Sequence, residues 1–359
     1  MISLDDFEKY ARDNLPRSVF NHVSSGADDQ QTLQDNRNAF KRLRIRPRVL
    51  RDVSKRDLSA TILGQHVPFP IGICPSAIQK HNGSDGEMAT AKAASSMESI
   101  MILSTYSSTS LEEVASAAPT GHLWFQLYVL KDREKTARLV CRAEKAGYKA
   151  IVFTADTPYA GRKLNDERSG GFKPTVRLFD TFTFRCPNVE SSSGQSSYGS
   201  SEISPSVTWS YIRWIQSLSS LPVIIKGIMS GDSAREAVAA GVDGIMVSNH
   251  GGRQLDGVLA SIDILPEVIA VTQGTNVEVY LDGGVRLGTD VLKALALGAK
   301  AVFIGRPVWW GLTYKGEEGV RQVLELLRDE LSLAMALSGC ASVNDLSPSM
   351  LIRGHPSNL

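Results

Sequence analysis

Eight short apolar runs, separated by segments with a helical pattern, constrain the fold of this chain more than any other feature. Runs of this length without polar alternation are typical of parallel strands that are buried on both faces. They occupy residues 70–75, 100–105, 123–129, 150–156, 222–227, 244–249, 277–284 and 301–307. Most of the intervening segments, such as "KTARLVCRAEKAG" and "DVLKALALG", have a helical pattern that ends at glycine. Eight alternating units of this kind predict an α/β fold, the (β/α)8 TIM barrel.

Two segments depart from the regular spacing of this barrel. The first 60 residues contain no strand-like run, so we expect an N-terminal helical extension packed on the barrel. A long loop follows the fourth strand and includes the Ser- and Gly-rich "ESSSGQSSYGSSEISPS". Because such sequence buries little apolar surface, we predict a mobile loop at about 164–204, either a lid over the site or a passive linker. We expect the 359 residues, 1–359, to form one domain.

Charge and composition exclude several classes of partner. The chain has 39 basic and 38 acidic residues, a formal net charge of +1, so it lacks the basic footprint of proteins that bind nucleic acid or anionic membranes. The cysteines are scattered without a C-x-x-C pair, which predicts neither a metal site nor a disulfide framework. They are Cys74, Cys141, Cys186 and Cys340. These features favour a small-molecule partner.

Both ends of the chain bear on its location. The N-terminal residues lack the pattern of a signal peptide, and no apolar run approaches a bilayer-spanning length, so we expect a soluble intracellular protein without a membrane partner. The last three residues, Ser357, Asn358 and Leu359, resemble the peroxisomal S-K-L address without its basic residue. We expect a peroxisomal location, with the cytoplasm as the alternative.

Polar residues gather at the carboxyl ends of the expected strands, where the βα loops of a barrel build its site. A buried charge costs several kcal/mol unless it is paired, so packing alone does not account for this ring. Its members are Pro75, Ser76, Ala77, Ser104, Gln126, Tyr128, Thr154, Asp156, Lys226, His250, Arg253, Asp282, Arg286, Gly305 and Arg306. The sequence therefore predicts one polar binding site at the mouth of the barrel.

Two glycine-rich loops within this ring predict a phosphate site. "LDGGVR" and "IGRP" follow the seventh and eighth strands, where this fold frequently binds phosphate. Their glycines let backbone N–H groups approach the phosphate, and Arg286 and Arg306 add positive charge. Lys226 ends a wholly apolar run, and its amine could form a Schiff base, bind phosphate or place a fixed positive charge beside a cofactor.

The stretch "SNHGGRQLDG", residues 248–257, combines two glycines with a base and a guanidinium. We interpret Gly251 and Gly252 as keeping the strand end clear for a flat bound group. His250 then offers a general base, and Arg253 offers a fork for a carboxylate. Asp156 is expected to hold the imidazole and stabilise its protonated form, as the carboxylate of a catalytic triad does.

Together these motifs resemble the FMN-dependent 2-hydroxy acid oxidases. The resemblance rests on "SNHGGRQLDG", "FQLYV", "TADTP", "IIKGI", "YLDGGVRLGTDVLKALALGAK" and "FIGRPV", and it runs from the "SGADD" turn near residue 26 to "MALSGC" near 340. It implies FMN bound across the strand ends, its phosphate near Gly284, Arg286, Gly305 and Arg306, and Lys226 beside the flavin. Further cofactor contacts would come from Pro75, Ser76, Ala77, Ser104, Gln126, Thr154, Ser248, Asp282 and Gly283.

The resemblance also implies a reaction, the oxidation of an (S)-2-hydroxy acid to a 2-oxo acid with O2 as acceptor and H2O2 as product. His250 would take a proton from the substrate, either from C2 or from the hydroxyl, and Asp156 would pair with it. Tyr128 would approach the substrate oxygen and Arg253 would bind the carboxylate. A homotetramer is implied as well. The alternatives are a dehydrogenase of the same family with another electron acceptor, and a flavin-binding relative without turnover.

Three positions depart from the pattern of glycolate oxidase within this family. Lys163 stands where a second carboxylate-binding arginine follows "DTP", with Arg162 one residue earlier as a substitute. His22 replaces a tyrosine that contacts the carboxylate, and Tyr106 replaces a tryptophan that limits the pocket. Lysine lacks the bidentate fork of arginine, and tyrosine is smaller than tryptophan. These departures predict a preference for medium- or long-chain 2-hydroxy acids over glycolate.

Overall fold

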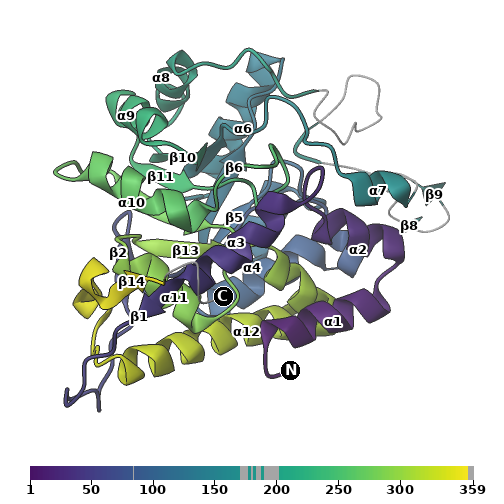
Figure 1. The fold of residues 1–359 in the computed structure, drawn as a ribbon. Helices are drawn as coiled ribbons and strands as arrows, with labels where there is room; N and C mark the ends of the chain where they lie inside the picture. The colour runs from purple at the N-terminus through teal and green to yellow at the C-terminus, as the bar shows by residue number, and fades with distance from the viewer. Residues whose placement is uncertain (84, 170–176, 179–180, 183–186, 190–201, 355–359) are drawn as a thin grey trace.

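Eight parallel strands close into a barrel in the computed structural model, which describes residues 1–83, 85–169, 177–178, 181–182, 187–189 and 202–354 (Figure 1). Neighbouring strands follow the order β10-β11-β12-β13-β4-β5-β6-β7. Their bounds are β4 Ile71–Ile73, β5 Ile100–Leu103, β6 His122–Leu127, β7 Ile151–Thr154, β10 Val223–Ile228, β11 Gly244–Val247, β12 Glu278–Asp282 and β13 Ala301–Ile304. Each strand falls on a predicted run, so the predicted (β/α)8 barrel is confirmed.

Packing fills the inside of the barrel. Trp124, Tyr280 and Phe303 point inward from β6, β12 and β13, and their ring centroids lie 5.6 to 5.8 Å apart. A hairpin of β2 Ala60–Ile62 and β3 Gln65–Val67 adds Ile62 and Val67 to this inner cluster. The backbone N–H of Leu63 in the hairpin turn donates to the Glu278 carboxylate at the start of β12. The amino end of the barrel is therefore covered, and the site lies at the carboxyl end.

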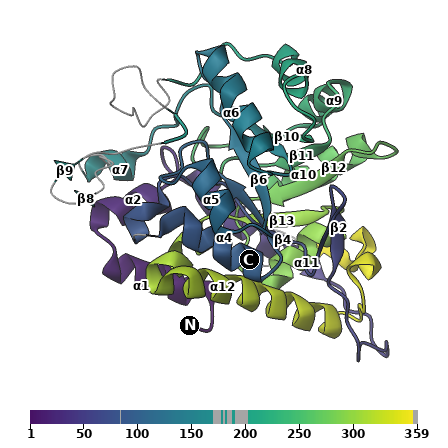
Figure 2. The same cartoon turned by 180° about the vertical axis from the view of Figure 1, so that it is seen from behind.

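Helices surround the barrel on its outside (Figures 1 and 2). Local capping fixes where several begin: Ser110 and Glu113 form a capping box on α5, and the Asp132 side chain accepts two N–H groups of α6. The outer helices are α4 Gly86–Ser96, α5 Leu111–Ala117, α6 Arg133–Lys145, α8 Ser210–Gln216, α9 Gly231–Ala239, α10 Ser261–Thr272, α11 Gly288–Ala296 and α12 Arg306–Leu337. The longest, α12, consists of two helices joined by a kink at Lys315 and Gly316.

The predicted helical extension is present but includes a strand. Its helices are α1 Leu4–Asn14, α2 Arg17–Ser24 and α3 Gln31–Arg42. Phe7 of α1 packs edge-on against Tyr314 of α12, with ring centroids 5.5 Å apart. The expectation of a strand-free N-terminal segment was wrong, because β1 Leu43–Ile45 pairs antiparallel with β14 Leu351–Arg353 near the other end of the chain. A three-residue strand whose partner is so distant leaves no periodic signal in the sequence.

The connection between β7 and β10 is the long loop that the sequence predicts. It contains α7 Leu164–Arg168 and two short paired strands, β8 Arg177–Leu178 and β9 Thr181–Phe182. Most of the predicted mobile loop at about 164–204 lies outside the described residues, as do Cys186 and the C-terminal residues 357–359. Among the described residues, no helix combines the length and apolar character needed to cross a membrane.

Candidate active site

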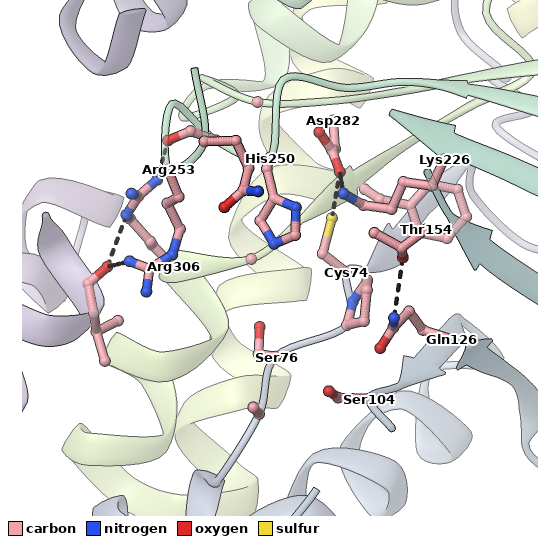
Figure 3. Close-up of a pocket in the computed structure, with 18 of the residues that line it drawn as sticks. Cys74, Ser76, Ser104, Gln126, Thr154, Lys226, His250, Arg253, Asp282 and Arg306 are labelled. Atoms are coloured by element: carbon pink, nitrogen blue, oxygen red, sulfur yellow. Dashed lines mark hydrogen bonds and ion pairs between the residues drawn. The ribbon is translucent and has the colours of Figure 1, made fainter. Parts of the chain in front are cut away.

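A cavity of about 290 Å³ opens at the carboxyl end of the barrel (Figure 3). The predicted site residues that line it are His22, Pro75, Ser76, Ala77, Ser104, Tyr106, Gln126, Tyr128, Thr154, Lys163, Lys226, His250, Arg253, Asp282, Gly283, Gly284, Arg286, Gly305 and Arg306. Asp156 and Ser248 lie behind this lining and hydrogen-bond to His250 and Lys226. The structure thus brings together side chains from all eight strand ends and from α2.

His250 and Asp156 form the pair that the sequence predicts. The imidazole Nδ1 lies 2.9 Å from Asp156 Oδ1, and the Thr157 hydroxyl donates to the same oxygen at 3.0 Å. Burial alone would raise the pKa of Asp156, but the charges of His250 and Lys226 outweigh it and lower this pKa to about 2. Asp156 is therefore a carboxylate that holds Nδ1, which leaves Nε2 as the ring nitrogen available to a substrate in the cavity.

The loop that carries His250 has an unusual backbone. His250, Gly251 and Gly252 all have left-handed φ values, of 57°, 64° and 72°. A Cβ at Gly252 would lie 2.7 Å from the Leu33 backbone nitrogen, and one at Gly251 would lie 2.8 Å from the Arg306 guanidinium. The interpretation of these glycines as clearance for a flat group was incomplete, because they are needed for close packing against α3 and Arg306. A left-handed backbone is strained for a residue other than glycine, and His250 adopts it. Such strain is typical of functional sites.

Lys226 is a buried cation that lines the cavity. Its Nζ lies 3.3 Å from Asp282 Oδ2 and donates to Ser248 Oγ at 2.9 Å. Burial lowers the pKa of Lys226, but the charges of Asp282 and Asp156 outweigh it and raise the pKa above its usual value. A Schiff base requires a neutral amine, so this environment favours the fixed positive charge among the three predicted roles.

The wall on the side of β5 to β7 is a network of hydrogen bonds. Gln126 Nε2 donates to Thr154 Oγ1 at 3.0 Å, and its Oε1 accepts the Thr105 N–H at 3.1 Å. Ser104 Oγ accepts the Tyr106 N–H, which turns the loop so that the Tyr106 ring meets Tyr128 at 5.6 Å between centroids. These contacts hold the predicted polar groups in place from within the protein.

A second network fixes the loops after β4 and β5. The buried carboxylate of Glu87 on α4 accepts the backbone N–H groups of Gln79 and Ser108 at 2.9 and 2.8 Å. It also accepts the hydroxyls of Ser108 and Thr109. Glu87 therefore fixes two loops whose residues line the cavity.

The loops after β12 and β13 concentrate positive charge. Arg286 and Arg306 are partly buried, and desolvation is the main cause that lowers the pKa of Arg286 to about 10 and that of Arg306 well below its usual value. Arg306 donates to the backbone carbonyls of Val23, Ser25 and Gly251. Within the part of the chain that the structure describes, neither guanidinium is paired with a carboxylate, and Arg286 Nε has no hydrogen-bond partner. Two partly buried cations that pair with no carboxylate of the described residues fit a bound phosphate.

The predicted carboxylate-binding groups lie on the same side of the cavity as Arg306, since Arg253 and Arg306 both donate to the Val23 and Ser25 carbonyls. Arg253 donates to the carbonyls of His22, Val23 and Ser25, which holds its guanidinium beside the end of α2. Lys163 also lines this side, and burial together with the charge of Arg253 lowers its pKa to about 8. Arg162, the predicted substitute, does not reach the cavity, because its side chain is 67% exposed and pairs with Glu167 on the surface.

Several residues of the site are not among those that the sequence predicts. Cys74, Thr157, Gln254 and Trp309 line the cavity. Thr157 and Gln254 fall inside the quoted motifs "TADTP" and "SNHGGRQLDG", so their position there is a signal that could have found them. The Cys74 thiol donates to Asp282 Oδ2 at 3.4 Å, and its pKa is raised by burial. Nothing in the sequence distinguishes Cys74 or Trp309 from ordinary core residues.

Residues 11–353 match the family described as FMN-dependent dehydrogenase. The chain belongs to this family. The FMN-dependent dehydrogenase is 50% identical to human 2-hydroxyacid oxidase 1, over 99% of this chain and 97% of the relative. It is 48% identical to glycolate oxidase of Spinacia oleracea, over 97% and 94% of the two chains. A solved structure of mandelate oxidase with benzoyl-formic acid covers 98% of both chains at 42% identity, with a TM-score of 0.87.

Family membership makes this dehydrogenase an FMN enzyme, and the cavity fits that cofactor. The partly buried guanidiniums of Arg286 and Arg306 suit the phosphate of FMN. Asp282 Oδ1, which is buried without a hydrogen-bond partner, can accept a hydrogen bond from a hydroxyl of the cofactor. A Cβ at Gly305 would lie 3.7 Å from the Cys74 Cβ, an ordinary van der Waals contact, so close packing within the protein does not require a glycine here. Lys226 adds a buried positive charge to the lining of the same cavity.

Proposed function

We propose that this protein oxidises (S)-2-hydroxy acids to 2-oxo acids and passes the electrons to O2. The substrate loses two protons and two electrons from its C2 carbon and hydroxyl, and O2 gains them to form H2O2. The single observation that carries the proposal is the His250–Asp156 pair, held at 2.9 Å beside Lys226 and Arg253 in one cavity. A general base, a fixed cation and a carboxylate-binding fork are the groups that this oxidation requires.

Different residues bind the substrate and take its proton. Arg253 binds the substrate carboxylate, with Lys163 and His22 beside it, and Tyr128 approaches the substrate oxygen. His250 Nε2 takes a proton from the substrate, either from C2 or from the hydroxyl, and both routes stay open. Asp156, ionised and hydrogen-bonded to Nδ1, stabilises the imidazolium that results.

The proposal includes the residues that would hold the cofactor, all of which line or support the same cavity. Bound FMN supplies the acceptor of two electrons. Arg286, Arg306, Gly284 and Gly305 would hold its phosphate, and Lys226 would present its charge to the ring. The remaining cofactor contacts are Pro75, Ser76, Ala77, Ser104, Gln126, Thr154, Asp282 and Gly283, with Ser248 supporting Lys226.

A substrate larger than glycolate is part of the proposal. Tyr106 and His22 line the cavity at the positions where glycolate oxidase has tryptophan and tyrosine, and a phenol occupies less space than an indole. Each additional buried methylene contributes about 0.8 kcal/mol to binding. The relatives include proteins named for glycolate and for mandelate, so both a small and an aromatic acid are compatible with the fold. Medium- or long-chain and aromatic 2-hydroxy acids are the proposed substrates.

Assembly and location complete the proposal. We propose that residues 1–359 act as one FMN-binding domain in a homotetramer, in the peroxisome or, alternatively, in the cytoplasm. The formal net charge of +1, which gives no basic footprint for nucleic acid, supports a small-molecule enzyme. Light scattering of the purified protein tests the tetramer. The location of a reporter fused ahead of "HPSNL" tests whether this C-terminal segment is a peroxisomal targeting signal.

An anaerobic substrate panel tests the reaction. Oxidised holoprotein is mixed with 2-hydroxy acids of increasing length and with (S)-mandelate, and bleaching of the flavin absorbance is followed. Readmitted O2 should restore the absorbance and release one H2O2 per flavin. Bleaching without reoxidation by O2 indicates a dehydrogenase with another acceptor. A flavin that no hydroxy acid bleaches indicates a binding protein without turnover and rejects the proposal.

A further inference from the structure

His22 is held by a carboxylate that the proposed reaction does not use. Its Nδ1 lies 2.8 Å from Asp166 Oδ2, and the two side chains are 12% and 13% exposed. His22 belongs to α2 and Asp166 to α7, 144 residues further along the chain. His22 lines the cavity, whereas Asp166 lies outside its lining. The pair therefore connects the wall of the cavity to the first helix after β7.

The hydrogen bond determines which hydrogen-bonding atom His22 can offer. A carboxylate only accepts hydrogen bonds, so Asp166 requires a proton on Nδ1. A neutral imidazole then has a lone pair on Nε2, which repels a carboxylate oxygen. The opposite tautomer would place the Nδ1 lone pair 2.8 Å from Asp166, where two acceptors repel each other. His22 can therefore donate to a bound carboxylate only when both of its nitrogens carry a proton.

The surrounding charges favour that proton once an anion arrives. Without a ligand, burial and the positive charge of Arg253 lower the pKa of His22 to about 4, Lys163 lowers it further, and Asp166 opposes them. Arg306 adds a cation on the same side, where it donates to the Val23 and Ser25 carbonyls. A substrate carboxylate between Arg253 and Lys163 would cancel much of their repulsion and add attraction. The pKa of His22 should therefore rise when an anion binds.

We propose that His22 and Asp166 form a dyad that binds the substrate carboxylate by taking up one proton. Asp166 is a positioning residue that holds Nδ1–H, and the protonated ring donates from Nε2 to the carboxylate. This inference rests on the proposed function, since it assumes that a 2-hydroxy acid binds with its carboxylate at Arg253. It makes the affinity for substrate and product a function of pH at a site distinct from the base His250.

Equilibrium binding of product anions tests the dyad without turnover. Pyruvate and benzoylformate are titrated into oxidised, FMN-loaded protein at pH 5, 6 and 7, and binding is read from the flavin absorbance. This window lies below the lowered pKa of Lys163, which is about 8. The dissociation constant should rise at least tenfold from pH 5 to pH 7, since uptake of one proton changes affinity by about tenfold per pH unit. Titration calorimetry in two buffers of different ionisation enthalpy should detect the proton directly.

Three variants show whether the pH dependence of binding comes from His22 and Asp166 or from neighbouring charged groups. His22→Tyr keeps a donor that does not titrate below pH 7, so its affinity should be nearly constant over the window, although His250 is unchanged. Asp166→Asn keeps an acceptor but loses the charge, so affinity at pH 6 should fall about tenfold, and the pH dependence should move to lower pH. Glu167→Gln removes a charge from the same helix on its exposed side and should behave as the parent. Flavin content and melting temperature confirm that each variant is folded.

The outcomes distinguish the dyad from the proposed function. If the parent binds both anions with the same affinity at pH 5 and 7, or if His22→Tyr keeps the full pH dependence, the dyad is wrong and the proposed function stands. If the folded holoprotein binds neither anion at any pH and no hydroxy acid bleaches its flavin, the proposed function fails and the dyad fails with it.

Discussion

Asn36 and Asn249 exchange two side-chain hydrogen bonds, each Nδ2 donating to the other's Oδ1 at 2.8 Å. Both are buried, and they join α3 to the loop that carries His250 across 213 residues of sequence. Asn249 Oδ1 also accepts the Gly252 N–H at 3.1 Å, so the same amide fixes the left-handed turn. The strained backbone at His250 is therefore held from the N-terminal extension, outside the barrel itself.

Replacing Asn36 should weaken both the fold and the reaction. Asn36→Leu removes both hydrogen bonds with Asn249 and the one that Asn36 Oδ1 accepts from the Ser261 N–H at 3.4 Å, and it should lower the free energy of unfolding by about 1–3 kcal/mol. It should also lower kcat, because the backbone that aims His250 loses its support. Asn38→Leu on the same helix is the control, since Asn38 is exposed. Denaturant unfolding and steady-state rates check both effects, and an unchanged kcat in a destabilised Asn36→Leu would confine Asn36 to a structural role.

His250→Gln should keep FMN and lose flavin reduction. Glutamine preserves much of the volume but cannot accept the substrate proton, and general base catalysis contributes about 100- to 10,000-fold. Stopped-flow reduction under anaerobic conditions measures the loss, and the oxidised flavin spectrum shows that the cofactor is still bound. Reduction at the parent rate would assign the base to another residue.

Lys226→Met should lower the flavin midpoint potential and weaken FMN retention, because the charge that balances the reduced ring is gone. It also leaves the Asp282 carboxylate buried without its cation, which costs about 3–5 kcal/mol. The double variant Lys226→Met with Asp282→Asn removes that unpaired charge and should recover part of the stability while the potential stays low. A potential that returns with the stability would show that Lys226 acts only through the fold.

Acid stability should depend on His22. Its pKa is lowered to about 4 in the folded protein, mainly by burial, from an ordinary value of 6.5. The folded state binds fewer protons at this residue between these values, so the stabilisation is fully present above pH 6.5 and is lost as pH falls toward 4. The change is on the order of 3 kcal/mol. Unfolding of ligand-free His22→Gln should show a smaller loss over this range, and a loss as large as the parent's would place the titration elsewhere.

Substrate preference should follow the cavity wall. The double variant His22→Tyr with Tyr106→Trp should shift the ratio of kcat/KM toward glycolate, because the larger indole removes space for a long chain. Each methylene that loses its buried surface costs about 0.8 kcal/mol, or roughly fourfold in kcat/KM. Kinetics with glycolate and with a six-carbon 2-hydroxy acid measure the ratio in parent and variant. Glycolate as the best substrate of the unmodified protein would refute the size preference.

The sequence predicted the barrel because its signals are local. Each strand is an uninterrupted apolar run, and each strand end carries the polar residue that faces the cavity, so Lys226, Asp282 and His250 could be placed from spacing alone. Neighbouring residues are harder to place. Lys163 lines the cavity, whereas the Arg162 side chain lies on the surface. In an irregular loop the sequence does not show which of two neighbouring side chains faces the site.

Contacts between distant segments could not be read from the sequence. Asn36 and Asp166 have no motif around them, and each acquires its role from a partner more than one hundred residues away. The β1–β14 pairing is of the same kind. Side chains that hold a site from outside depend on tertiary packing, which residue periodicity does not record.

The pairing of β4 with β13 closes the barrel, and it has a consequence for how the protein is made. During synthesis β4 emerges from the ribosome long before β13, the strand with which it pairs. Asn36 of α3 likewise emerges 213 residues before Asn249, its hydrogen-bond partner in the loop that carries His250. At about 5–20 residues per second a ribosome needs roughly 10 to 40 s to cover that interval. For this time the nascent chain has open strand edges, which are templates for aggregation. The cavity can form only near the end of translation, after β13 and the loop that follows it have been made.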